Sequence, residues 1–159
     1  MENLCLQCGL CCSGVLFADV RRERGDRSPL FTQHGPRVPQ PCPAFNSGNC
    51  QCALYTARPA RCRQFECKQL LAVAAGKTTT ALALKKIKAA RKLAAQVTAL
   101  LGQFEVEPHL EKLALSKRFQ AVQRAAEHGH LAPDQFDTLA DLQLAVHRLN
   151  TTLAQDFYA

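Results

Sequence analysis

The cysteines of this chain are confined to its N-terminal part. All nine lie within the first 67 residues, and the 92 residues that follow hold none. Thiols at this density organise a small fold, either as a metal site or as a disulfide framework. The chain opens Met1-Glu2-Asn3-Leu4-Cys5, without the basic and apolar segments of a secretion signal, so we expect a cytosolic location. A reducing cytosol favours metal ligation, and nine cysteines cannot all pair within one chain.

The cysteine-containing part has the composition of loops. Residues 1–67 carry most of the prolines and several glycines, with little hydrophobic periodicity. Residues 21–43 link two groups of cysteines through charged residues, glycine and proline, and are expected to run over the surface. Such a segment has too little apolar area to order itself, so metal coordination is expected to supply the missing folding free energy.

The rest of the chain has helical periodicity. The pattern predicts one helix from Pro59 to Gly76, a second from Thr78 or Thr79 to Leu101, a third from Pro108 to Gly129, and a fourth after Asp134. The expected apolar stripes are Leu82, Leu93, Val97 and Leu100; Leu115, Phe119, Val122 and Ala126; and Leu139, Leu142, Val146, Leu149, Leu153 and Phe157. The predicted fold is mainly α: a loop-rich cysteine-cluster metal-binding module, residues 1–68, followed by a small antiparallel helical bundle, residues 69–159.

The chain is basic, with 20 Lys and Arg against 13 Asp and Glu and a formal net charge of +7. Eight thiolates around two divalent ions would lower this to +3, so the charge is weak support for a nucleic-acid partner, which we do not expect. Lys85, Lys88, Arg91 and Lys92 lie opposite the apolar stripe of the second helix and are read as a solvated face. No apolar stretch has membrane-spanning length. The helical half is expected to bind a protein partner, and the oligomeric state stays open.

The first four cysteines have the spacing of a metal site. In Cys5-x-x-Cys8-Gly9-x-Cys11-Cys12, a tight turn can bring two thiolates onto one centre, and Gly9 can adopt the positive φ that such a turn often needs. Neighbouring side chains generally point apart, so Cys11 and Cys12 imply either two centres or one cluster with spread ligands. Cys62 and Cys67 would stand about 140° apart on a straight helix and need not serve the same centre.

These residues identify a resemblance to a known family. The N-terminal half resembles the YkgJ-type cysteine-cluster proteins, whose CxxCxxCC domain is described as zinc- or iron-chelating. The shared pattern is C-x2-C-G-x-C-C, a later cysteine, and C-x-x-Y-x2-R-P-x2-C-R-x-F-x-C. In this sequence its positions are Cys5, Cys8, Gly9, Cys11 and Cys12; Cys42 and Phe45; and Cys52, Tyr55, Arg58, Pro59, Cys62, Arg63, Phe65 and Cys67. Cys50 lies outside the pattern, and the resemblance covers about residues 5–67.

The resemblance implies a metal centre and its ligands. The implied ligands are Cys5, Cys8, Cys11, Cys12, Cys42, Cys52, Cys62 and Cys67. Eight thiolates could bind two zinc ions in closed four-sulfur sites, hold an iron–sulfur cluster, or accept Cu(I). We favour iron–sulfur or iron over zinc, and copper ranks below both. Arg58 or Arg63 could donate hydrogen bonds to metal-bound sulfur, and Tyr55 and Phe65 are expected to pack against the cluster.

Three functions remain open. The first is a cytosolic metal-binding accessory protein whose helices recruit a partner. The second is an enzyme, because a related cysteine-cluster domain occurs in flagellin lysine methylases, although this chain has no glycine-rich adenosyl-binding signature. The third is a copper or iron store or chaperone in which Cys50 is an exchangeable ninth thiol.

Metal removal should unfold the cysteine half selectively. Because residues 1–67 depend on coordination for their order, a strong chelator should make their amides exchange with solvent, while those of the predicted helices after Gly76 stay protected. Hydrogen exchange followed by mass spectrometry on the full chain, before and after chelation, measures both parts at once. Equal protection in the two samples would contradict the expectation.

Overall fold

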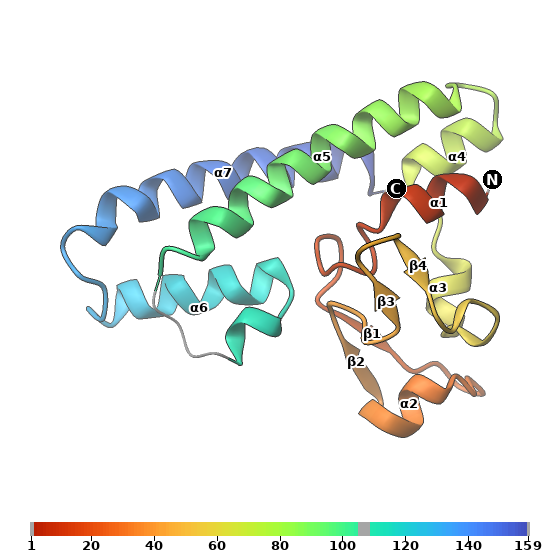
Figure 1. Ribbon diagram of the computed structural model, residues 1–159, viewed down its shortest axis with the longest axis horizontal. Coiled ribbons are helices and arrows are strands. Elements are labelled where there is room, and N and C mark those ends of the chain that lie inside the picture. The colour runs from red at the N-terminus through yellow and green to blue at the C-terminus, as the bar shows by residue number, and fades with distance from the viewer. Residues whose placement is uncertain (1, 105–108, 159) are drawn as a thin grey trace.

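The structure, a computed structural model that describes residues 2–104 and 109–158, is built mainly of helices (Figure 1). This confirms the predicted fold class. The helices are α1 (Glu2–Cys8), α2 (Pro29–His34), α3 (Ala60–Gln64), α4 (Lys68–Ala74), α5 (Thr80–Leu101), α6 (Leu115–Glu127) and α7 (Gln135–Asp156), with short 3-10 helices at Tyr55–Ala57 and Leu110–Lys112. Two antiparallel strand pairs complete it: β1 (Asp19–Arg21) with β2 (Arg37–Pro39), and β3 (Phe45–Asn46) with β4 (Gln51–Cys52).

Helix α5 is the centre of the helical half. It begins where the Thr79 hydroxyl accepts a hydrogen bond from the Leu82 amide at 3.2 Å, and it ends at Gly102, as the sequence predicts. It contacts α1, α4, α6 and α7, and Figure 1 shows α7 running back along it in the opposite direction. Within the described residues, no helix has both the length and the apolar character needed to cross a bilayer.

The apolar faces of the helices follow the prediction in α7 but not in α5. Five of the six residues predicted for the fourth helix are fully buried, and Val146 is partly buried. In α5 the predicted stripe is wrong at Leu82, whose exposed fraction is 55%, and Leu93 and Leu100 are only partly buried. The buried face of α5 consists of Ala83, Ile87, Ala90, Ala94, Val97 and Leu101. Its small alanines allow neighbouring helices to approach closely, and this moves the core face away from Leu82.

The predicted helix from Pro59 to Gly76 is two helices instead. Phe65 and Cys67 have extended backbones, which separate α3 from α4. The Phe65 ring stands edge-on to Phe17, with 4.8 Å between the ring centroids, so the interruption places an aromatic side chain in the core. The predicted start of the third helix at Pro108 falls outside the described residues, and α6 itself begins at Leu115.

Residues 21–43 are more ordered than expected. They contribute the end of β1, all of α2 and all of β2. Val38 of β2 pairs with Val20 of β1. Leu30, Phe31, Val38 and Ala44 form a small core of their own. The expectation of a surface excursion without apolar burial is therefore wrong for this segment, although its loop-rich character is confirmed. The protein therefore has two cores. Leu4, Leu10 and Leu16 belong to the other, larger core, together with buried side chains of the helices.

Asp26 links the segment around the small core to α3. Its exposed fraction is 5%, and its carboxylate accepts hydrogen bonds from the Ser28 amide at 3.0 Å and the Ala60 amide at 2.6 Å. Ala60 is the first residue of α3, so the carboxylate satisfies an amide that has no partner within the helix. The contact holds α3 beside residues that precede it by more than thirty positions.

The C-terminal end of α7 returns to the cysteine half. Gln69 is buried and donates from Nε2 to the Asp156 carbonyl at 2.7 Å, and the Lys68 amide donates to the Phe157 carbonyl at 3.1 Å. The Tyr158 hydroxyl donates to the Leu16 carbonyl at 2.9 Å. Both ends of the chain therefore meet near α1 (Figure 1). The domain boundary at residue 68 stays a prediction.

Replacing Asp26 should destabilise the cysteine half. Asp26→Asn keeps the shape but leaves one amide without a carboxylate oxygen, so we expect a loss of about 1–3 kcal/mol in the free energy of unfolding. Urea denaturation followed by circular dichroism measures it. Asp141→Asn, on the exposed face of α7 and beyond its first turn, is the control and should change the free energy of unfolding by less than about 0.5 kcal/mol. Equal effects of the two substitutions would refute this role of Asp26.

Candidate metal centre

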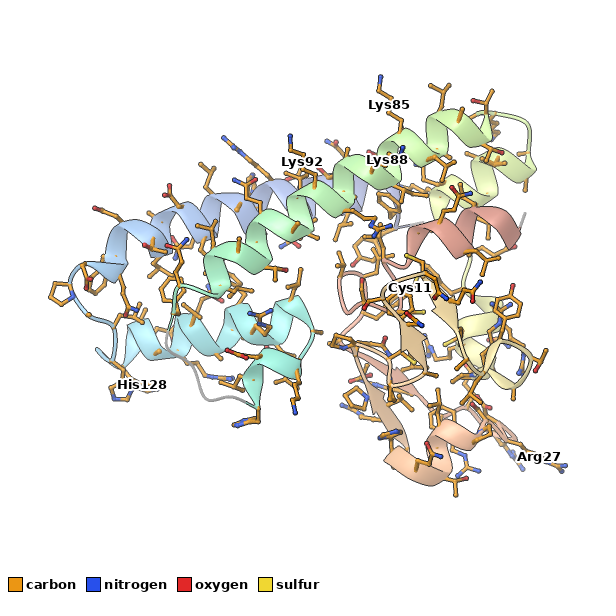
Figure 2. All side chains as sticks on the ribbon, in the orientation of Figure 1. Cys11, Arg27, Lys85, Lys88, Lys92 and His128 are labelled. Atoms are coloured by element: carbon orange, nitrogen blue, oxygen red, sulfur yellow. The ribbon has the colours of Figure 1, made fainter. Side chains whose placement is uncertain are left out.

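One cavity gathers every cysteine of the chain. It has a volume of about 580 Å³, and its walls include Cys5, Cys8, Cys11, Cys12, Cys42, Cys50, Cys52, Cys62 and Cys67. The remaining walls are largely apolar and include Leu4, Leu10 and Leu16 from the larger core and Leu30 from the smaller one. The cavity therefore lies between the two cores. Figure 2 shows Cys11 just beyond α1, within the cysteine half.

Different elements bring the thiols to the cavity. Cys5 and Cys8 lie on α1, Cys11 and Cys12 in the turn after it, Cys52 on β4, and Cys62 on α3. Cys67 is the residue that caps α4, and the amide of Cys42 donates a hydrogen bond to the carbonyl of Cys12 at 2.8 Å. Cys5 is exposed and the other eight are partly buried. The thiols are thus accessible to a small ion, and all but Cys5 are partly shielded from bulk water.

Gly9 shapes the turn that follows α1. Its φ is +67°, as the sequence predicts, and its carbonyl accepts hydrogen bonds from the amides of Cys12 and Ser13. A Cβ at this position would lie 2.8 Å from Cζ of Phe45. The glycine is therefore required both for the conformation of the turn and for the close approach of the β3–β4 hairpin.

The cysteines are thiols, and burial keeps several of them protonated. All nine lie in the described residues and none forms a disulfide. Burial raises the pKa of Cys8 and Cys12 from 9.0 to about 12 and that of Cys62 to about 11. Burial also raises the pKa of Cys11 and Cys42, and neighbouring cysteines add to the effect. At neutral pH these five thiols are therefore uncharged.

The structure separates the roles of the two predicted arginines. Arg58 lies in the cavity wall, stacks on the Tyr55 ring at 4.1 Å, and lowers the pKa of Cys62 as a smaller effect that opposes burial. Its Nε is buried, and within the described part of the chain it has no hydrogen-bond partner. Arg63 is exposed and donates to the Arg58 carbonyl at 2.7 Å. Arg58 is thus the arginine placed to donate to a metal-bound sulfur.

The thiols share a cavity but do not form a finished coordination sphere. Across residues 2–104 and 109–158, no three Cys, His, Asp or Glu side chains are grouped closely enough to hold a metal ion. His34, a histidine that lies between the two groups of cysteines in the sequence, is exposed at the end of α2. The eight-cysteine ligand set therefore stays a prediction.

Two residues of the site were not anticipated from the sequence. Asp26 positions α3 and therefore Cys62, but a single acidic residue in a loop gives no signal of this. Arg91 was assigned to a solvated face of α5, and it is exposed, yet its Nη1 donates to the Gln7 carbonyl at 3.2 Å and to Sγ of Cys50 at 3.6 Å. The helical half thus contributes directly to the surroundings of the thiols.

Residues 4–93 match the family model described as "CxxCxxCC: Putative zinc- or iron-chelating domain". The chain belongs to this family. The match extends past the last cysteine through α4 and into α5, the helices that pack beside the cysteine half. Searches of curated proteins and of solved structures found no match.

The residues present fit zinc or iron. Thiolate sulfur ligates both metals, and the cavity offers nine thiols. The buried Arg58 Nε supplies a donor that lacks a partner and lies beside Cys62. Both the donor set and the orphaned donor are therefore suited to a thiolate-bound metal.

The affinity of the protein for a metal ion should increase steeply as the pH rises. The ligand is the thiolate, so each buried thiol must release a proton when it binds, and acid favours the metal-free state. Because burial raises the pKa of Cys8 and Cys12 from 9.0 to about 12, the dependence should persist beyond about pH 10, where thiols with the ordinary pKa would be largely ionised. Competition with a chromophoric chelator between about pH 7 and 11 measures the affinity, after correction for the chelator's own protonation. An affinity that levels off near about pH 10 would contradict burial of the free thiols.

Proposed function

We propose that this protein is a cytosolic accessory protein that binds iron, as an iron–sulfur centre or as iron itself, or zinc, in the cysteine cavity. The observation that carries the proposal is the gathering of all nine cysteines around one cavity, although they come from α1, the turn after it, β4, α3 and the segments between these elements. The absence of disulfides among these nine described thiols supports a reducing compartment. The partly apolar walls would strengthen electrostatic attraction between an ion and its thiolates.

The helical half is the part we assign to a protein partner. The exposed side of α5 carries Lys85, Lys88 and Lys92, and Figure 2 shows Lys85 and Lys92 extending away from the rest of the molecule. Leu82 on α5 and Leu144 on α7 are 55% and 49% exposed. Exposed lysine and leucine side chains on these helices suit a partner that offers acidic and apolar residues.

A metal store or chaperone is the second candidate function. Cys50 lies outside the family pattern, yet it lines the same cavity and is close to Gly9 and Arg91. A ninth thiol beside eight others could accept a metal ion in transit. An enzyme is the remaining alternative, and no arrangement of side chains in the described residues favours a particular reaction.

Metal analysis after anaerobic purification tests the proposal. Brown protein with broad visible absorbance and bound iron would support an iron–sulfur centre, and colourless protein with about two zinc ions per chain would support closed zinc sites. Metal that leaves readily to a competing chelator would favour the store. A chain that contains neither iron nor zinc, and takes up neither when reconstituted, would refute the proposed function.

A further inference from the structure

The cysteines divide between the two cores. Cys8, Cys11 and Cys67 pack against the larger core of helices. Cys42 and Cys52 pack against the smaller core of Leu30, Phe31, Val38 and Ala44. The cavity that all nine line is therefore bounded by different thiols on its two sides.

Proximity among the thiols gives the same division. Apart from its sequence neighbour, the thiols close enough to act electrostatically on Cys11 are Cys8, Cys67 and Cys5. The thiols that act on Cys12 are Cys42, Cys62 and Cys52, with Cys5 the weakest contributor. Cys62 in turn is influenced by Cys42 and Cys52.

Each group also has one arginine. Arg91 of α5 acts on Cys8 and donates to Sγ of Cys50 beside it. Arg58 acts on Cys62, and its buried Nε has no partner in the described part of the chain. Four thiolates around a divalent ion carry two excess negative charges, so a guanidinium beside each group would offset part of the charge.

The backbone explains how adjacent residues can belong to different groups. The turn after α1 is fixed by the Gly9 carbonyl, which accepts from the Cys12 and Ser13 amides. The carbonyl of Cys12 accepts a hydrogen bond from the amide of Cys42, which packs against the smaller core. Leu10 is buried in the larger core, and Cys11 packs against that core. Cys11 and Cys12 are therefore the point where the chain passes from one group to the other.

We propose that the thiols form two separate metal centres. Centre 1 consists of Cys5, Cys8, Cys11 and Cys67. Centre 2 consists of Cys12, Cys42, Cys52 and Cys62. The assignment rests on the proposed function, and it leaves Cys50 outside both centres. Each centre has the four sulfurs of a closed site, and binding would draw the sulfurs of one group together. Centre 1 would tie α1 to α4, and centre 2 would tie the turn after α1 to β4 and α3.

The two centres should differ in the rate at which they exchange metal. Cys5 is the exposed thiol of the nine and belongs to centre 1, whereas the four thiols of centre 2 are all partly buried. A chelator should therefore remove metal in two phases, and Cys67→Ser should abolish the faster one.

Cadmium-113 substitution tests the division by nuclear magnetic resonance. The full chain loaded with cadmium should give two resonances of equal intensity and no cadmium–cadmium coupling. Cys67→Ser should remove or shift one resonance and Cys52→Ser the other, each with about half of the bound cadmium lost. Cys50→Ser is the matched control and should retain both resonances.

The outcomes separate failure of the division from failure of the proposed function. A single resonance, coupling through a bridging sulfur, or loss of the same resonance in both variants would overturn the two-centre assignment while metal binding stands. If a variant does not fold, the number and coupling of the wild-type resonances still decide the question. A chain that binds neither cadmium, zinc nor iron would overturn the proposed function itself.

Discussion

The burial of three leucines from the N-terminal segment determines where the thiols lie. Leu4, Leu10 and Leu16 belong to the larger core, together with Ile87 of α5 and Phe157. Cys5 and Cys8 share α1 with Leu4, and Cys11 follows Leu10 directly in the turn after it, so burial of these leucines brings the thiols beside the same core. The helical half is therefore the surface against which the cysteine cavity is built.

The smaller core depends on polar links and on the thiols. Leu30, Phe31, Val38 and Ala44 are few side chains for a segment of this length, and burial of so small a set stabilises a fold only weakly. Asp26 adds a buried connection from this segment to α3. Metal ligation in centre 2 would link Cys42 and Cys52, which pack against this core, to Cys12 in the turn after α1.

The sequence predicts the long helices well because their signals are local. The Thr79 cap, the stop at Gly102 and the spacing of apolar residues in α7 all act within a few residues of the helix they define. The face of α5 was predicted wrongly because buried alanines carry little hydrophobic signal, and Ala83, Ala90 and Ala94 form much of it. The interruption at Phe65 and the small core around Val38 depend on partners distant in sequence, such as Phe17 and Val20. Local periodicity has no information about such contacts.

The positive charge of the chain has a use within the molecule. The formal charge of +7 counts every cysteine as neutral, which matches the raised pKa of the buried thiols but not their state when a metal is bound. Two four-thiolate centres with divalent ions would bring four negative charges into partly apolar surroundings, where an unbalanced charge is costly. Arg58 and Arg91 approach from opposite halves of the chain, and each acts on a thiol of a different group. These two arginines are therefore the part of the positive charge that is placed to offset metal-bound thiolates.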